Sequence, residues 1–225
     1  MTKFQISVKA IIYWNDRYLL RKNERNEWEL LGGRIENIGE NLEYRLHTEL
    51  LEESGISIEI IKPREPWFYN IGNTRTVIIA PYYCSAINVP DILEDEDGGV
   101  VAWHTADEIR TLNMPYGYFD SIQGVPPRNS FSAIPETREN EMLLKPKVVK
   151  PWRPYPEFEP RIIVNSEKRV DRNIWATIST TENVRQSAFT IAKKITTAEL
   201  IDVTFMSFSI DSSNFLVEYL ACYDM

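Results

Sequence analysis

The sequence is poor in the residues from which many catalytic and metal sites are built. Its 225 residues include two cysteines, Cys84 and Cys222, and two histidines, His47 and His104. Two cysteines so far apart predict no disulfide framework and favour a reducing, cytoplasmic location. The histidines lack the spacing of metal ligands, so we expect ordinary surface or packing roles for both.

Long apolar runs are also missing. No stretch approaches the roughly 18 apolar residues that a membrane-spanning helix needs, so we expect no membrane partner. The N-terminal segment lacks the layout of a signal peptide, because Lys9 interrupts its apolar residues. The alternating pattern of residues 5–14 predicts a β-strand instead.

Basic residues are too few to balance the acidic ones. The chain has 25 lysines and arginines against 33 aspartates and glutamates, a net charge of −8. Residues 126–225 hold 13 of each kind, so the whole net charge lies in residues 1–125. Such a surface repels duplex nucleic acid, which we exclude as a partner. A small phosphate-bearing ligand is compatible with it where a bound cation reverses the local field.

Glycine is scarce, yet four of the nine glycines stand in adjacent pairs: Gly98-Gly99 ends an acidic loop, and Gly32-Gly33 marks a turn. The pattern predicts that a short strand enters this turn and that a helix of about residues 40–54 follows. Apolar residues recur along the helix at one helical face. Gly55 is the expected C-cap, since glycine adopts the left-handed conformation most easily.

The predicted helix carries three acidic residues on one face. Glu49, Glu52 and Glu53 stand at positions i, i+3 and i+4. Like charges at this spacing repel one another by a few tenths of a kcal/mol per pair in an exposed helix. A bound cation would offset the repulsion, and oxygen ligands suit Mg²⁺, with Mn²⁺ as an alternative. Taken without its surroundings, however, such a face is more typical of a solvated acidic surface than of a metal site.

Residues 32–56 resemble the Nudix box, which reads G-x5-E-x7-R-E-U-x-E-E-x-G-U, where U is a bulky aliphatic residue. The segment from Glu40 to Ile56 matches the second part of this pattern except at Thr48, where the family has arginine. One residue is inserted between Gly33 and Glu40, around Asn37-Ile38. Just upstream the family often reads W-E-x-P-G-G, whereas this chain has leucine before the two glycines.

The resemblance implies an α+β fold for residues 1–125, namely a Nudix-type α/β/α sandwich with a mixed sheet. It also implies metal-assisted hydrolysis of a pyrophosphate bond. The implied catalytic residues are Glu49, Glu52 and Glu53. The same three glutamates are expected to bind the metal ion, together with a backbone carbonyl at the glycine turn, placed at Gly33, and an acid on the loop before the last strand, placed at Glu96.

Residues outside the box complete the expected site. Arg34, Trp67 and Tyr69 are the candidate substrate-binding residues. An aromatic ring can stack on a base, but core packing explains the two aromatics equally well. Glu40 either caps the helix or takes a metal-linked role.

Thr48 lacks the guanidinium that orients neighbouring glutamates in the family. Arg45 lies four residues before Glu49, so it can supply such an ion pair from a different position.

The rest of the chain differs in character. Eight of the 13 prolines fall within residues 124–160, so residues 126–160 are interpreted as a proline-rich connector. The pattern of residues 161–225 predicts a small β-α-β-β domain, whose stability would be marginal if it folded alone. We expect it to dock on the first domain or on its copy in a homodimer.

Three functions are compatible with the sequence. The first is a hydrolase that cleaves the pyrophosphate bond of a nucleoside diphosphate linked to another moiety, which makes a nucleotide sugar, a dinucleotide or a nucleoside triphosphate the small-molecule partner. The second is a catalytically weak or inactive Nudix module that binds a nucleotide as a sensor. The third is an interaction protein whose acidic helix is merely solvated. Saturable binding of Mg²⁺ or Mn²⁺ distinguishes the third from the other two.

Overall fold

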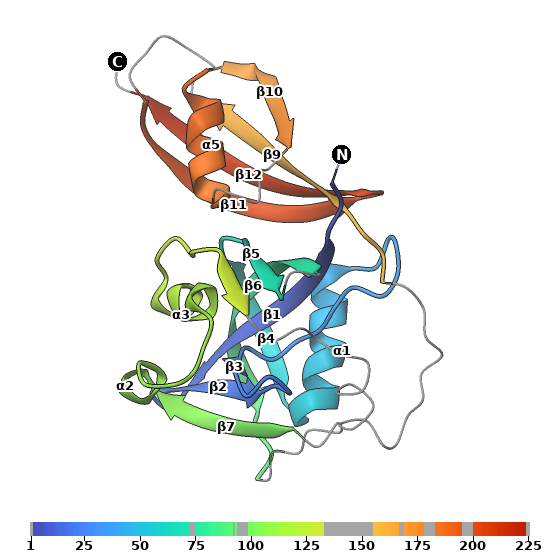
Figure 1. Cartoon of the computed structure of the whole chain (residues 1–225), viewed down its shortest axis with the longest axis vertical. Helices are drawn as coiled ribbons and strands as arrows, with labels where there is room; N and C mark the ends of the chain where they lie inside the picture. The colour runs from blue at the N-terminus through green and yellow to red at the C-terminus, as the bar shows by residue number, and fades with distance from the viewer. Residues whose placement is uncertain are drawn as a thin grey trace.

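The structure is a computed structural model that describes residues 2–72, 75–91, 93, 99–132, 155–166, 169–177, 183–194 and 200–223. It contains two β-sheets, which Figure 1 shows stacked along the long axis of the molecule. None of the helices in the described ranges is long and apolar enough to cross a membrane.

Eight strands form the first sheet, in which β1 is central. Their bounds are β1 (Gln5–Trp14), β2 (Arg17–Lys22), β3 (Trp28–Glu29), β4 (Ser57–Pro63), β5 (Trp67–Ile71), β6 (Arg75–Asn88), β7 (Val100–Thr105) and β8 (Ser130–Ser132). β1 pairs parallel with β6 and antiparallel with β2. The sheet is therefore mixed, as the sequence predicts.

Helices cover both faces of this sheet (Figure 1). α1 (Leu42–Ser54) lies on one side, and α2 (Ala106–Ile109) and α3 (Tyr116–Gln123) lie on the other. Side chains of β1 alternate between two hydrophobic clusters: Val8 and Ala10 belong to the cluster under α1, and Ile11 to the cluster under α3. The predicted α/β/α sandwich of the α+β class is confirmed.

α1 forms where the sequence predicts it. The Asn41 side chain accepts a hydrogen bond from the Tyr44 backbone N–H at the N-cap, and Gly55 ends the helix in the left-handed conformation with φ 68°. The helix packs through its leucine stripe, whose buried members are Leu42, Leu46 and Leu50. With this stripe buried against the sheet, Glu49 and Glu53 of the acidic face lie at the glycine turn.

Pro81 lies within β6 without breaking it. The strand pairs with β5 through residues 75–79 and with β4 through residues 82–88. The proline, which has no N–H to donate, therefore falls where β6 changes partners. A proline inside a strand often marks an edge or a bulge. Here it marks a change of partner inside a long strand, and the pairing with β4 is irregular between Ile60 and Lys62.

The second sheet has four strands in the order β10-β9-β12-β11. Its elements are β9 (Glu159–Ser166), β10 (Arg169–Thr177), α5 (Val184–Ala192), β11 (Leu200–Asp211) and β12 (Asn214–Tyr223). Their order along the chain is β-β-α-β-β, so the predicted β-α-β-β order lacked the first strand. β9 begins beside Pro160, and β8 also lies within the segment predicted as a connector. Both strands were missed because the prolines around them made the sequence resemble an extended connector.

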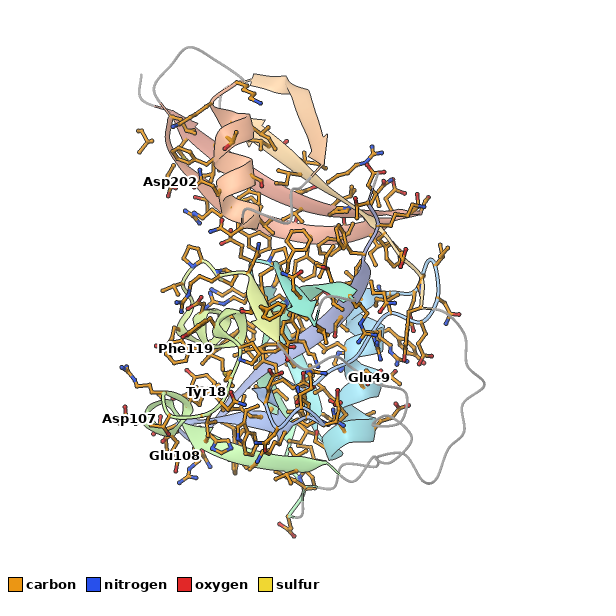
Figure 2. The ribbon with its side chains drawn as sticks, viewed as in Figure 1. Tyr18, Glu49, Asp107, Glu108, Phe119 and Asp202 are labelled. Carbon is orange, nitrogen blue, oxygen red and sulfur yellow. The ribbon has the colours of Figure 1, made fainter. Side chains whose placement is uncertain are left out.

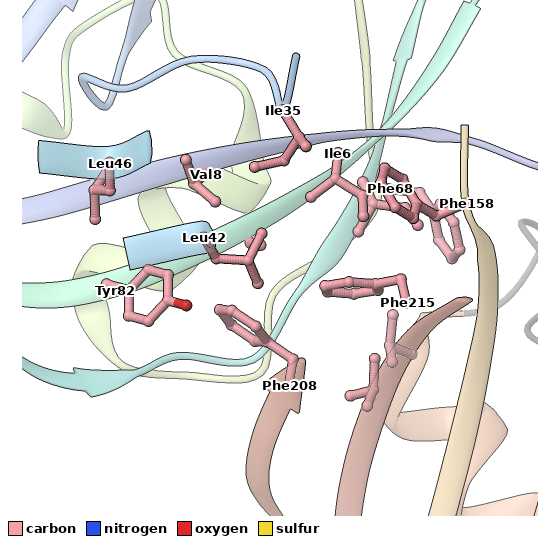
Figure 3. Close-up of a cluster of buried hydrophobic side chains, with 14 of the residues drawn as sticks. Ile6, Val8, Ile35, Leu42, Leu46, Phe68, Tyr82, Phe158, Phe208 and Phe215 are labelled. Carbon is pink, nitrogen blue, oxygen red and sulfur yellow. The ribbon is translucent and has the colours of Figure 1, made fainter. Parts of the chain in front are cut away.

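Aromatic residues join the two sheets. Phe4 and Phe158 exchange backbone hydrogen bonds of 2.9 and 2.8 Å. Phe208 of β11 lies against Tyr82 of β6, with the ring centroids 5.0 Å apart. Figure 3 shows the rings of Tyr82, Phe158 and Phe208 in the same buried cluster as Leu42 under α1. The two sheets therefore share one hydrophobic core.

Candidate active site at the glycine turn

The glycine turn is held against the central strand. The backbone N–H of Val8 donates to the Gly33 carbonyl at 2.9 Å, and Ala10 donates to Leu31 at the same distance. Gly32 has φ 125°, a conformation that favours glycine, and a Cβ there would overlap the Val8 carbonyl oxygen. The turn is therefore held in place, and the Gly32 N–H is free to donate to a side chain of α1.

Glu49 reaches this turn from α1 (Figure 2). A Cβ on Gly33 would overlap the Glu49 carboxylate, so the absence of a side chain at Gly33 is what admits it. Arg45 Nη2 donates to Glu49 Oε1 and, at 3.0 Å, to Glu36 Oε1. The predicted pairing of Arg45 with Glu49 is therefore present, whereas the Thr48 hydroxyl donates to the Tyr44 carbonyl at 3.1 Å.

Glu53 is buried beside the first glycine. Its Oε2 accepts a hydrogen bond of 2.7 Å from the Gly32 N–H, and Arg21 Nη1 lies 3.5 Å from its Oε1. Burial raises the pKa of Glu53 to about 7, although the charges of Arg21 and Lys9 lower it. A further positive charge would therefore favour the ionised carboxylate.

A buried network of charges extends from Glu53 across the first strands. Glu29 Oε1 lies 3.6 Å from both Lys9 Nζ and Arg21 Nη1, and its Oε2 lies 3.9 Å from Arg25 Nη2. Burial disfavours ionisation of Glu29, but these three cations lower its pKa overall. Lys9 Nζ also donates to the Gly32 carbonyl at 2.7 Å.

Sequence reasoning missed this network as part of the site. One signal was available: Lys9 interrupts an otherwise apolar segment that reads as a central strand. A lysine there must find acidic or carbonyl partners in the interior.

The predicted metal ligands are only partly brought together. Glu49 and Glu53 meet the glycine turn, Glu52 is half-buried on the same helix, and Glu96 lies outside the described residues. Within the described ranges, no three acidic, histidine or cysteine side chains form a group that could hold a metal ion. The full set of Gly33, Glu49, Glu52, Glu53 and Glu96 stays a prediction.

Glu40 stabilises the loop before α1. Its Oε2 accepts hydrogen bonds from the backbone N–H groups of Glu36 at 2.7 Å and Asn37 at 3.2 Å. The carboxylate therefore closes the loop that contains the inserted residue. Asn41, the next residue, is the helix cap.

The three candidate substrate-binding residues have different surroundings. Arg34 follows the glycine turn, and its guanidinium lies 4.1 Å from the centre of the Tyr155 ring. Trp67 and Tyr69 are 0% and 1% exposed in the cluster under α3. The Tyr69 hydroxyl donates to Glu27 Oε2 at 2.5 Å. Both aromatic residues therefore pack in the core, which is the alternative that the sequence left open for them. Neither ring has an exposed face on which a base could stack.

The donor atoms at the glycine turn are carboxylate and peptide oxygens. Carboxylate and peptide oxygens are the ligands that hard cations prefer. The Glu49 carboxylate occupies the space that a side chain at residue 33 would fill, and Glu53 is fixed beside it by the Gly32 N–H. Protein cations already contact both carboxylates, through Arg45 and Arg21.

No family model matches the sequence, and neither does any curated protein. Solved structures do resemble it. A MutT Nudix hydrolase from Burkholderia pseudomallei is 20% identical, with 54% of this chain and 97% of that chain covered and a TM-score of 0.48. A Nudix hydrolase from Nitrosomonas europaea is 23% identical, with 48% and 77% covered and a TM-score of 0.44.

A third solved structure, a UDP-X diphosphatase, is 13% identical, with 58% of this chain and 68% of that chain covered and a TM-score of 0.45. The family named for the first two structures is the one that residues 32–56 resemble. Because the identities are low and about half of this chain is covered, its activity has to be inferred from its own residues.

Proposed function

We propose that the protein is a Nudix-type pyrophosphohydrolase. Its proposed substrate is a nucleoside diphosphate linked to another moiety, as in a nucleotide sugar, a dinucleotide or a nucleoside triphosphate. One observation carries the proposal: two carboxylates one helical turn apart, Glu49 and Glu53, contact the two consecutive glycines of the turn. This arrangement supports the proposal because carboxylate oxygens suit a hard cation and the backbone beside them has no side chains to exclude a phosphate.

The proposed cofactor is Mg²⁺, with Mn²⁺ as an alternative. Glu49, Glu53 and the Gly33 carbonyl would hold it, and Glu52 and Glu96 are proposed as further ligands. When bound, the cation supplies charge neutralisation for the phosphate oxygens and orients the attacking water.

The chain's own residues prepare this site. Arg45 restrains the Glu49 side chain, and the Gly32 N–H restrains Glu53. Arg34, directly after the turn, is proposed to contact the substrate phosphates. Trp67 and Tyr69 are both buried, so their rings cannot stack on a substrate base.

A specific observation favours a second candidate, a nucleotide-binding module with little turnover. Arg45 pairs with Glu49, and Arg21 lies 3.5 Å from Glu53. Ion pairs of this kind stabilise the carboxylates without a metal ion and compete with its binding. Such a module would bind the same nucleotides and release little product.

The two candidates are distinguished by product release from a panel of nucleotide sugars, dinucleotides and nucleoside triphosphates with Mg²⁺ or Mn²⁺. Glu53→Gln keeps the shape of the side chain and an oxygen acceptor for Gly32, but loses the charge. We expect turnover by the wild type, and loss of at least about a hundredfold in this variant. The matched control is Glu43→Gln, which removes an exposed glutamate of the same helix. Binding without turnover on any member of the panel would favour the second candidate.

The location and assembly of the protein stay predictions from the sequence. We propose a cytoplasmic location and a homodimer. The small size of the second sheet is not an argument for the dimer, because this sheet packs on the first sheet of its own chain. Sedimentation of the full chain tests the oligomeric state, and a monomer at micromolar concentration would contradict it.

A further inference from the structure

Lys9 is a charged residue at the centre of the first sheet. It is 5% exposed and lies in β1, opposite Pro81 of β6 in the strand register. Its neighbours Val8 and Ala10 are completely buried. A buried ammonium is retained at such a position only where its partners repay its desolvation.

The partners of Lys9 all belong to the candidate site or adjoin it. Its Nζ donates to the Gly32 carbonyl at 2.7 Å and lies 3.6 Å from Glu29. The N–H of the same Gly32 donates to Glu53, so residue 32 connects the ammonium to a proposed ligand. Glu29 does not depend on Lys9 alone, because Arg21 and Arg25 also lie within 4 Å of it.

We propose that the ammonium of Lys9 is a resident cation of the glycine-turn site and weakens the binding of divalent cations there. The inference rests on the proposed function. Lys9 engages the Gly32 carbonyl, which a cation at the turn would also attract, and its charge repels a second cation at short range.

A consequence concerns the order of binding. Mg²⁺ is often held by one or two protein carboxylates together with substrate phosphates. With Lys9 in place, the metal ion should bind weakly to the free protein and more tightly once a phosphate ligand adds negative charge. Lys9 is therefore a positioning residue that couples metal binding to substrate binding.

The test is a titration of the full chain with Mn²⁺, in which free Mn²⁺ is followed by electron paramagnetic resonance. Wild type, Lys9→Gln and Lys62→Gln are compared, with and without inorganic pyrophosphate. Lys62→Gln removes an equal charge from an exposed position of β4. The titration is run at about pH 8.5, above the Glu53 pKa of about 7, because loss of the Lys9 charge also favours the neutral form of that carboxyl. Under this condition we expect Lys9→Gln to bind Mn²⁺ about tenfold more tightly than wild type without pyrophosphate. The control should match wild type.

Two results would overturn the proposal in different ways. Equal Mn²⁺ affinity in wild type and Lys9→Gln would overturn the role of Lys9 and leave the metal site standing. Absence of saturable binding in all three proteins would contradict the metal site itself. If thermal unfolding shows that Lys9→Gln does not fold, Lys9→Met takes its place in the same comparison, because it removes the charge and keeps an unbranched apolar side chain at the buried position, while Arg21 and Arg25 still pair with Glu29.

Discussion

Arg45 contacts the carboxylate that the arginine of the Nudix box would orient from position 48. It lies four residues before Glu49, so its guanidinium reaches the carboxylate along the same helix face and also contacts Glu36. Thr48 instead bonds to the backbone of its own helix. An arginine at position 45 can thus pair with the Glu49 carboxylate in place of an arginine at position 48.

Replacement of Arg45 by alanine should therefore damage the site. For the proposed hydrolase we expect Arg45→Ala to lower both kcat/KM and Mn²⁺ affinity by about ten- to a hundredfold, because partners that orient metal ligands have effects of this size. For the second candidate, in which Arg45 competes with the metal ion, Mn²⁺ affinity would rise instead. Arg45→Lys should recover part of the loss. Thr48→Ala serves as the control on the same helix. Unchanged activity and metal affinity in Arg45→Ala would contradict the role assigned to Arg45.

The two glycines of the turn should respond differently to alanine. At Gly33 the added Cβ meets only the end of the flexible Glu49 side chain, whereas at Gly32 it meets backbone at a positive φ. Gly33→Ala should lower Mn²⁺ affinity with little change in stability. Gly32→Ala should lower the free energy of unfolding by about 1–3 kcal/mol or more. Urea unfolding and Mn²⁺ titration of both variants check this, and equal stability losses would contradict it.

At the scale of elements, local signals predicted α1 and the strands beside it well. Asn41, the leucine stripe and Gly55 act within one helix, so their meaning can be read from sequence spacing. β9 was missed because Pro160 resembles connector sequence, while the strand is specified by its pairing with β12, about 55 residues later. Lys9 and Glu29 were missed for the same reason, since strand register brings them together.

A polar contact links the edge of the first sheet to β12 and α5. The Tyr219 hydroxyl donates to Glu65 Oε1 at 2.5 Å, and Arg185 Nη1 lies 3.8 Å from Glu65 Oε2. Burial raises the pKa of Glu65, the Tyr219 hydrogen bond and the Arg185 charge lower it, and the charge of Asp202 raises it. The net shift is upward, so the folded protein holds this proton more firmly than the unfolded chain.

A raised carboxyl pKa sets the sign of the pH dependence. The stability that the neutral Glu65 provides is complete below its unfolded pKa and is lost as pH rises through the folded pKa. Tyr219→Phe removes a donor to the ionised form, so the loss in unfolding free energy should be about 1–3 kcal/mol near pH 8 and smaller at about pH 4, below the ordinary pKa of a glutamate. Urea unfolding at both pH values tests this, with the exposed Tyr44→Phe as control. A loss independent of pH would contradict it.

At the scale of the molecule, the two sheets share one core and should unfold together. Phe208 is 7% exposed, and its ring lies 5.0 Å from Tyr82 of the first sheet and 5.6 Å from Phe215 of the second. Hydrogen exchange should therefore give β1 and β12 the same free energy of opening. Truncation of this ring removes packing from both sheets, so Phe208→Ala should lower both values by about 3–5 kcal/mol.

The matched control is Met206→Ala, which truncates an exposed side chain, 52% accessible, on the same strand. It should leave both exchange free energies nearly unchanged, because few contacts are lost at the surface. If Phe208→Ala weakened protection in β12 alone, the second sheet would be an independently stable unit. The shared cluster would then be a docking surface between two separately folded parts. Equal loss in β1 and β12 is the result expected of a single core, because neither sheet can then open without exposing the apolar face of the other.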